Sequence, residues 1–239
     1  MRFWGPNIKI SGEWIMTSPN DDNLSANQKR AADDFEKQAQ DILRDISRND
    51  VGKPVLDAFT KASHAVTIRP LAANAVTKMG AQATFGDSAN ETDTGAPSAP
   101  GAGSDSTIWF YTSSVNIAGH LYRSDDSLIH ESFHSLRQAR GRWRATHQPG
   151  WGNREELYAT MITNIYASKD GRNSDMRGSH GFAFVAMTLT DEQFSQQYHN
   201  EILDFRTNTL DIYRIISDIQ GCWNPLRVFE TRFWLMHSG

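Results

Sequence analysis

The amino-acid sequence predicts an α+β fold, in which a small mixed or antiparallel sheet packs on helices and the C-terminal part of the chain is helical. Two observations carry this prediction. Short β-branched runs occur in the first half of the chain, and apolar residues recur at helical spacings of three and four before, between and after them. The length of 239 residues suits one domain of above-average size or a smaller domain with an appended subdomain.

Three elements are expected in the first quarter of the chain. Ile8, Ile10 and Trp14 stand among polar residues and suggest a short strand and a turn. A long packing helix is predicted over 24–48, because its apolar residues fall on one helical face. A second, shorter helix is predicted over 53–62, with a proline in its first turn.

Two predicted strands flank a segment of low complexity. Residues 65–69 alternate apolar and polar side chains, are rich in β-branched residues and stop at Pro70. Residues 86–106 hold almost only small, turn-forming or acidic side chains, which indicates a flexible surface loop. Residues 107–112, with the sequence TIWFYT, are dense in β-branched and aromatic side chains and predict the next strand.

The second half of the chain is predicted to be mostly helical. Helices are expected over 124–139 and 154–168, with a loop over 140–153 between them. A further helical stretch over 190–221 opens with a threonine and a glutamine spaced as in a capping box. The aromatic segment 225–234 carries no assignment from its pattern.

Composition excludes several classes of protein. With 38% hydrophobic residues, 10% aromatic residues and a formal charge of −4, the chain is neither disordered nor attractive to nucleic acid as a whole. No run of 18 apolar residues predicts a membrane span, and the first residues lack the apolar stretch of a Sec signal peptide. The single cysteine, Cys222, excludes an intrachain disulfide and suggests folding in a bacterial cytoplasm. Any export would therefore need a specialised, non-Sec apparatus.

The segment His130-Glu131-Ser132-Phe133-His134 carries the chemistry. On a helix, His130 and His134 project from one face, so both imidazoles can reach one metal ion. Zinc suits them, because it accepts neutral imidazole and keeps an open position for water. Glu131 would face the zinc-bound water and act as general base, taking a proton and delivering it to the leaving amine. The alternative is two helical histidines that bind no metal.

A catalytic zinc site needs a third protein ligand. Arg140 stands where a metzincin would have its third histidine, so that subclass is excluded. The other common solution is a glutamate from a following helix, and Glu155 and Glu156 are available. We expect Glu156 as the ligand, since the small Ala159 lies one turn later on the same face and allows close helix approach, with Glu155 as the substitute.

Peptide hydrolysis also needs a group that stabilises the oxyanion. His180 and Arg177 lie on a glycine-flanked loop after the helix predicted over 154–168, and His180 is the first candidate. Tyr158 is a weaker candidate. Asn164 could orient a ligand through a hydrogen bond. Taken singly, each of these residues has an ordinary structural interpretation as well.

Two further features have open interpretations. The arginines around Trp143 could dock an acidic protein segment or phosphate, although a solvated loop face is the more ordinary interpretation. Their positions are Arg137, Arg140, Arg142 and Arg144. The strand predicted over 107–112 could bind an extended substrate by adding one more strand, or it could be an ordinary sheet strand.

The order of these features resembles the NleD-like zinc metallopeptidase effectors, which bacteria inject into host cells. The resemblance covers roughly residues 8–182. Its matching pieces are the segments 8–12, 52–56, 66–68, 128–134 and 153–156, of which the HExxH and Glu-Glu blocks are the most specific. It implies a zincin-like fold, in which one active-site helix packs on the sheet and a second helix supplies the glutamate.

The resemblance also implies a function. We expect a zinc-dependent endopeptidase, a secreted effector or toxin that cleaves a protein of the target cell, with a secretion system, a chaperone or an immunity protein as possible partners. The expected catalytic domain is 1–182, and 183–239 is expected to be a helical extension packed on it. Where a tyrosine is expected after Arg177, this sequence has Ser179 and His180. Members of such families cut signalling kinases, but the unmatched extension leaves the target open.

Two other functions are compatible with the sequence. A zinc amidase acting on cell-wall peptide would keep the same metal chemistry. A binding protein with an accidental HExxH would bind no stoichiometric zinc.

Overall fold

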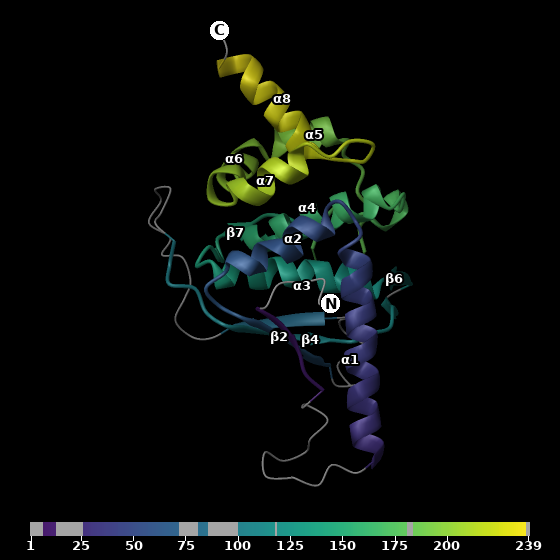
Figure 1. Ribbon diagram of the computed structural model, residues 1–239. Coiled ribbons are helices and arrows are strands. Elements are labelled where there is room, and N and C mark those ends of the chain that lie inside the picture. The colour runs from purple at the N-terminus through teal and green to yellow at the C-terminus, as the bar shows by residue number, and fades with distance from the viewer. Residues whose placement is uncertain are drawn as a thin grey trace.

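The computed structural model describes residues 7–12, 26–71, 81–85, 100–117, 119–180 and 184–237. In Figure 1 the sheet lies below the helix pair α3 (Ser124–Ala139) and α4 (Arg154–Lys169), and the C-terminal helices lie above that pair. Helix α3 therefore has the sheet on one side and helix α4 on the other. This arrangement is an α+β fold, as the sequence predicts.

The sheet has four strands in the order β1-β2-β4-β3. Strands β1 (Ile8–Ile10), β2 (Val66–Pro70) and β4 (Ser106–Phe110) run parallel, and β3 (Ala81–Phe85) pairs antiparallel with β4. The sequence predicts the first three within a few residues, although Trp14 lies outside the described residues. It misses β3, because alanine and glutamine have low β propensity and the strand is stabilised by its pairing with β4.

The sheet order corrects the substrate-binding role considered for residues 107–112. Strand β4 lies between β2 and β3, so its main-chain groups are paired on both sides. A further strand could only be added at an edge, and β3 is the edge that lies against α3.

The two N-terminal helices agree with the predicted ones. Helix α1 spans Ala26–Ile46 and buries one face. Its buried apolar residues are Phe35, Ala39, Leu43 and Ile46. Helix α2 (Gly52–Ala58) continues into the 3₁₀ turn η2 (Phe59–Lys61), and together they cover the short helix expected over 53–62. Both helices pack against α3.

Helices α3 and α4 begin and end almost where the sequence predicts. Every residue of α3 from Leu128 to Ala139 is buried except Glu131, which is half-buried. Two short hairpins were not predicted: β5 (Val115–Ile117) with β6 (His120–Tyr122), and β7 (His147–Gln148) with β8 (Gly152–Asn153). The second of them lies inside the loop expected over 140–153.

The segment expected to be a flexible loop over 86–106 is only partly described. Residues 86–99 lie outside the described residues, and the strand β4 already begins at Ser106. Residues 100–105 pack on the end of α3, since Ser104 and Gln138 exchange two hydrogen bonds. Gly103 has a φ of +76°, and a Cβ there would lie 2.5 Å from the carbonyl oxygen of Ala139. Residues 100–105 are thus a loop that packs on α3, and the predicted loop ends one residue earlier than expected, where β4 begins.

The C-terminal part is helical, as predicted. After the turn η3 (Asn173–Asp175) come α5 (Asp191–Gln197), α6 (His199–Asn208), α7 (Leu210–Ser217) and α8 (Pro225–His237). The capping box at the start of α5 is present. These helices share one hydrophobic core with the sheet and with α3. No helix in the described part of the chain is both long and apolar enough to cross a membrane.

Candidate metal centre

Three side chains from α3 and α4 converge on one point. His130 Nε2 and His134 Nε2 lie 3.1 Å apart, and each lies 3.1 Å from Glu156 Oε2. The three side chains are 6%, 4% and 18% exposed, respectively. They could hold a metal ion, because their ligand atoms all lie within 4.8 Å of one another.

Local sequence explains this convergence. His130 and His134 are one helical turn apart, so their rings leave the same face of α3. The side chain of Asn153 caps α4 by accepting a hydrogen bond from the Glu156 backbone N–H at 3.0 Å. The cap fixes where α4 begins and so places Glu156 in its first turn, opposite the two histidines.

The dimensions of the triangle can be compared with those of a tetrahedral metal site. In a tetrahedral site with bonds of about 2.0–2.1 Å, two ligand atoms lie about 3.3 Å apart. The observed separations of 3.1 Å are close to that value. Two imidazole nitrogens and one carboxylate oxygen are also a ligand set of catalytic zinc sites.

Burial and neighbouring charges shift the pKa values of all three groups. Burial lowers the pKa of His130 to about 3, so its ring is neutral near pH 7. Burial opposes ionisation of Glu156, but the charge of His134 and the bonds to both histidines hold the pKa of the carboxyl well below its usual range. For His134, burial is outweighed by Glu156, which raises the pKa of the ring. A cation bound by the three groups would replace the proton of His134.

Glu131 lies next to the cluster and is held by the sheet edge. Its Oε2 accepts a hydrogen bond of 2.8 Å from the backbone N–H of Ala83 in β3. Burial raises the pKa of the Glu131 carboxyl, which moves it towards the range that suits a general base near neutral pH. Ala83 was not a site candidate in the sequence, because a backbone N–H leaves no signature in side-chain type.

The loop after α4 reaches the same place. His180 Nε2 lies 3.2 Å from Glu156 Oε2, and the His180 ring is nearly parallel to that of His130 at a centroid distance of 5.7 Å. Arg177 Nη2 lies 3.4 Å from His130 Nδ1. Burial lowers the pKa values of both His180 and Arg177. The structure thus brings both loop candidates to the cluster.

Asn164 has a different role from the one considered for it. Its side-chain oxygen accepts from the Arg177 backbone N–H, and its side-chain nitrogen donates to the Arg177 carbonyl, both at 2.8 Å. It contacts the loop rather than a metal ligand. Asn164 therefore fixes the backbone from which the Arg177 guanidinium reaches His130.

The other two site candidates lie elsewhere. Glu155 is fully buried and accepts two hydrogen bonds from Arg137, at 2.6 and 2.9 Å, so it faces away from the histidines. The Tyr158 hydroxyl donates to Asp204 Oδ2 at 2.7 Å, within the C-terminal helices. Burial and the charge of Asp204 raise the pKa of Tyr158 well above its usual value. Neither residue is positioned to act at the cluster, so both assignments are corrected.

The four arginines around Trp143 contact side chains of the same chain. Arg137 pairs with Glu155, Arg140 with Asp211, and Arg144 with Asp204. Arg142 donates to the side-chain oxygen of Asn208 at 2.9 Å. The interpretation as a solvated loop face is therefore wrong, and the partners of this cluster lie on the chain's own helices α4, α6 and α7.

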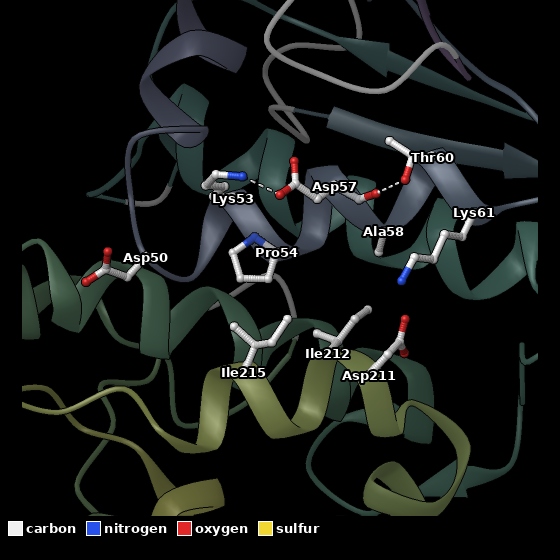
Figure 2. Close-up of a pocket in the computed structure, with 10 residues that line it drawn as sticks. All are labelled: Asp50, Lys53, Pro54, Asp57, Ala58, Thr60, Lys61, Asp211, Ile212 and Ile215. Atoms are coloured by element: carbon white, nitrogen blue, oxygen red, sulfur yellow. Dashed lines mark hydrogen bonds and ion pairs between the residues drawn. The ribbon is translucent and has the colours of Figure 1, made fainter.

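A groove of about 550 Å³ opens between α2 and α7, away from the cluster. Figure 2 shows Pro54 of α2 facing Ile212 and Ile215 of α7 across the groove, with the ion pair of Lys53 and Asp57 on the α2 side. None of its lining residues belongs to the metal centre. The groove marks a place where the C-terminal helices leave α2 partly uncovered.

Comparisons with known proteins agree with the geometry. The family model Peptidase_M91, described as effector protein, matches residues 23–176. This range contains the HExxH helix and Glu156 but ends before Arg177 and the helices α5 to α8. Searches of curated proteins and of solved structures found no match.

Proposed function

Because the chain belongs to the NleD-like Peptidase_M91 family of effector proteins, we propose that it is a zinc-dependent endopeptidase that cleaves a protein of a target cell. One observation carries the proposal: His130, His134 and Glu156 form a triangle of ligand atoms of zinc dimensions, with Glu131 beside it. The family's name assigns peptidase activity, and the triangle supplies a place for the metal.

The metal would be held by His130 Nε2, His134 Nε2 and Glu156 Oε2. When bound, zinc would polarise the scissile carbonyl and make water nucleophilic at neutral pH. Glu131 would take the proton of the attacking water and pass it to the leaving amine. Its bond to Ala83 N–H leaves the other carboxylate oxygen for this proton transfer and orients the group between β3 and the cluster.

Arg177 and His180 would stabilise the oxyanion. Both side chains lie beside the metal ligands, and both carry N–H groups that can donate to a developing negative charge. Asn164 would act through Arg177 as a positioning residue, since it holds the backbone of Arg177 at two points.

The substrate backbone would lie along β3. Ala83 directs its N–H away from β4 and towards Glu131, and groups two residues apart in a strand point the same way. The outer edge of β3 thus presents main-chain donors and acceptors beside the general base. An extended peptide that adds to this edge would bring a carbonyl to the cluster.

We further propose that the protein is delivered from the bacterial cytoplasm by a specialised secretion system, with a chaperone or an immunity protein as possible partner. The family's description as effector protein supports delivery into a host cell and a host protein as the target. Hydrolysis of cell-wall peptide is the competing substrate class and uses the same residues.

The test compares the native protein with Glu131→Gln, a variant that keeps the size of the side chain but cannot accept the proton. Each is incubated with target-cell extract and, separately, with peptidoglycan, and new peptide termini are identified by mass spectrometry. We expect termini in the extract with the native protein alone, and equal zinc content in both proteins. Equal cleavage by both proteins, or termini from peptidoglycan alone, would contradict the proposal.

A further inference from the structure

Trp143 lies beside the candidate metal centre, yet the proposed chemistry does not use it. The centroid of its ring lies 5.1 Å from that of His134, and the two planes are tilted by 59°. The indole is half-buried, so part of its surface remains accessible. His134 would bind the metal directly, so only one ring separates the indole from the place of reaction.

The backbone on both sides of Trp143 is tied to the buried pair Arg137–Glu155. Arg137 Nη2 donates to the carbonyl oxygen of Arg142 at 2.5 Å. The backbone N–H of Arg144 donates to Glu155 Oε1 at 2.9 Å. Both members of the pair have 0% exposed side chains. The loop residue between these two anchors is therefore held in place before any ligand arrives, which lowers the entropy cost of binding.

Helix α6 braces the same loop from outside. Asp204 Oδ1 accepts from Arg144 Nη1 at 2.9 Å, and Asn208 Oδ1 accepts from Arg142 Nη1 at 2.9 Å. Asp204 also accepts from the Tyr158 hydroxyl, which fixes its carboxylate. A helix outside the range that matches the family model thus contacts the loop that carries Trp143.

We propose that Trp143 is an apolar wall for the substrate side chain next to the scissile bond, and that Asp204 is a positioning residue that holds this wall. The proposal rests on the proposed function, since it concerns the substrate of the same site. Consecutive Cα atoms of a peptide are about 3.8 Å apart, so a side chain flanking the reacting carbonyl lies within reach of the indole. A rigid aromatic surface favours bulky apolar or aromatic side chains there.

The first test measures kcat/KM for a peptide library that varies the residues on both sides of the scissile bond. For the zinc-loaded native protein we expect a preference for Phe or Leu over Ser at one of these positions. Trp143→Ala should lower that preference about tenfold, and Trp143→Phe should restore most of it. Zinc content should be equal in all three proteins. An unchanged preference in Trp143→Ala, or no apolar preference in the native protein, would overturn the proposal.

The second test separates positioning from general destabilisation. Asp204→Asn weakens the bond to Arg144 and should lower the same preference, by less than Trp143→Ala does. Arg206→Gln is the matched control, because Arg206 lies on the same helix but pairs with Glu230 of α8. It should leave the preference unchanged. If both variants shift the preference equally, Asp204 has no positioning role.

A binding measurement keeps the two proposals distinguishable. Peptide hydroxamates bind zinc directly, so their affinity for the zinc-loaded protein can be measured by calorimetry without turnover. We expect the hydroxamate with a Phe side chain to bind about tenfold more tightly than its Ala counterpart in the native protein, and equally in Trp143→Ala. This result without any cleavage would reject the endopeptidase and retain the wall. Cleavage with equal affinities would reject the wall alone.

Discussion

Glu155 and Glu156 are neighbours at the start of α4 and have opposite surroundings. Glu155 is fully buried and faces the guanidinium of Arg137, whereas Glu156 is 18% exposed and faces two imidazoles. A carboxylate with a permanent cation beside it is neutralised within the protein. A carboxylate between two imidazoles has no permanent counter-charge, because a metal cation can replace the proton of His134, so Glu156 remains available to that cation. Glu155 thus stabilises the packing of α3 against α4, whereas Glu156, on the other face of this helix pair, is placed to bind a metal.

The largest expected effect tests the metal face. His134→Ala removes one ligand, so the variant should lose stoichiometric zinc and at least about a thousandfold in kcat/KM. Metal analysis after dialysis and a peptidase assay measure the two losses. His147→Ala is the control, because His147 is exposed on β7 and outside the cluster. Full zinc content in a His130→Ala/His134→Ala double variant would show that this site is wrong.

The direct comparison of the two glutamates should give opposite results. Glu155→Gln leaves Arg137 buried without its counter-charge, so the free energy of unfolding should fall by about 3–5 kcal/mol. Glu156→Gln should cost zinc affinity and change the unfolding of the metal-free protein much less. Urea denaturation and zinc titration of both variants provide the measurements. Similar losses of stability would remove the distinction between the two faces.

A third expected effect lies at the N-terminal end of α3. Asp126 forms an ion pair with Arg172, but burial and the nearby charge of Asp125 raise its pKa to about 6. A carboxyl whose pKa is raised from 3.8 on folding contributes stability below pH 4, and this contribution is lost as the pH rises through 6. The free energy of unfolding should therefore fall by about 2–3 kcal/mol across this interval.

Asp126→Asn isolates this contribution, because it removes the titrating group. The variant should show a flatter dependence of unfolding free energy on pH between 4 and 7, measured by denaturant titration at each pH. A native-like slope in the variant would assign the dependence to other carboxyls.

The smallest expected effect concerns the rim between α3 and α7. The pair Arg140–Asp211 lies partly in solvent, with side chains that are 17% and 45% exposed. A double-mutant cycle with Arg140→Gln and Asp211→Asn should give a coupling free energy below about 1 kcal/mol. A much larger coupling free energy would show that this partly exposed pair contributes as much to stability as the buried Arg137–Glu155 pair.

Much of the fold follows from local patterns. Helix α3 and the capping box of α5 are predictable, because the periodic spacing of apolar residues and the capping residues lie within short stretches of the sequence. Strand β3 is not, because Ala81, Gln82 and Ala83 carry no strand pattern and the partner strand β4 is distant in sequence. Likewise, residues 225–237 have no clear helical spacing of apolar residues, and α8 is stabilised by packing against α5 and α7.

By itself, the sequence determined that His130 and His134 share one helical face and limited the expected third ligand to Glu155 or Glu156, because the HExxH spacing and the Glu-Glu pair are visible in consecutive positions. Only the tertiary structure decided which glutamate turns to the histidines and that Ala83 holds Glu131. It also decided that Tyr158, Arg140, Arg142 and Arg144 bind the C-terminal helices. These outcomes depend on which partners are placed opposite each side chain when distant segments pack. The sequence pattern of a helix or strand shows which of its residues share a face, but it does not show which residues of a distant segment pack against that face.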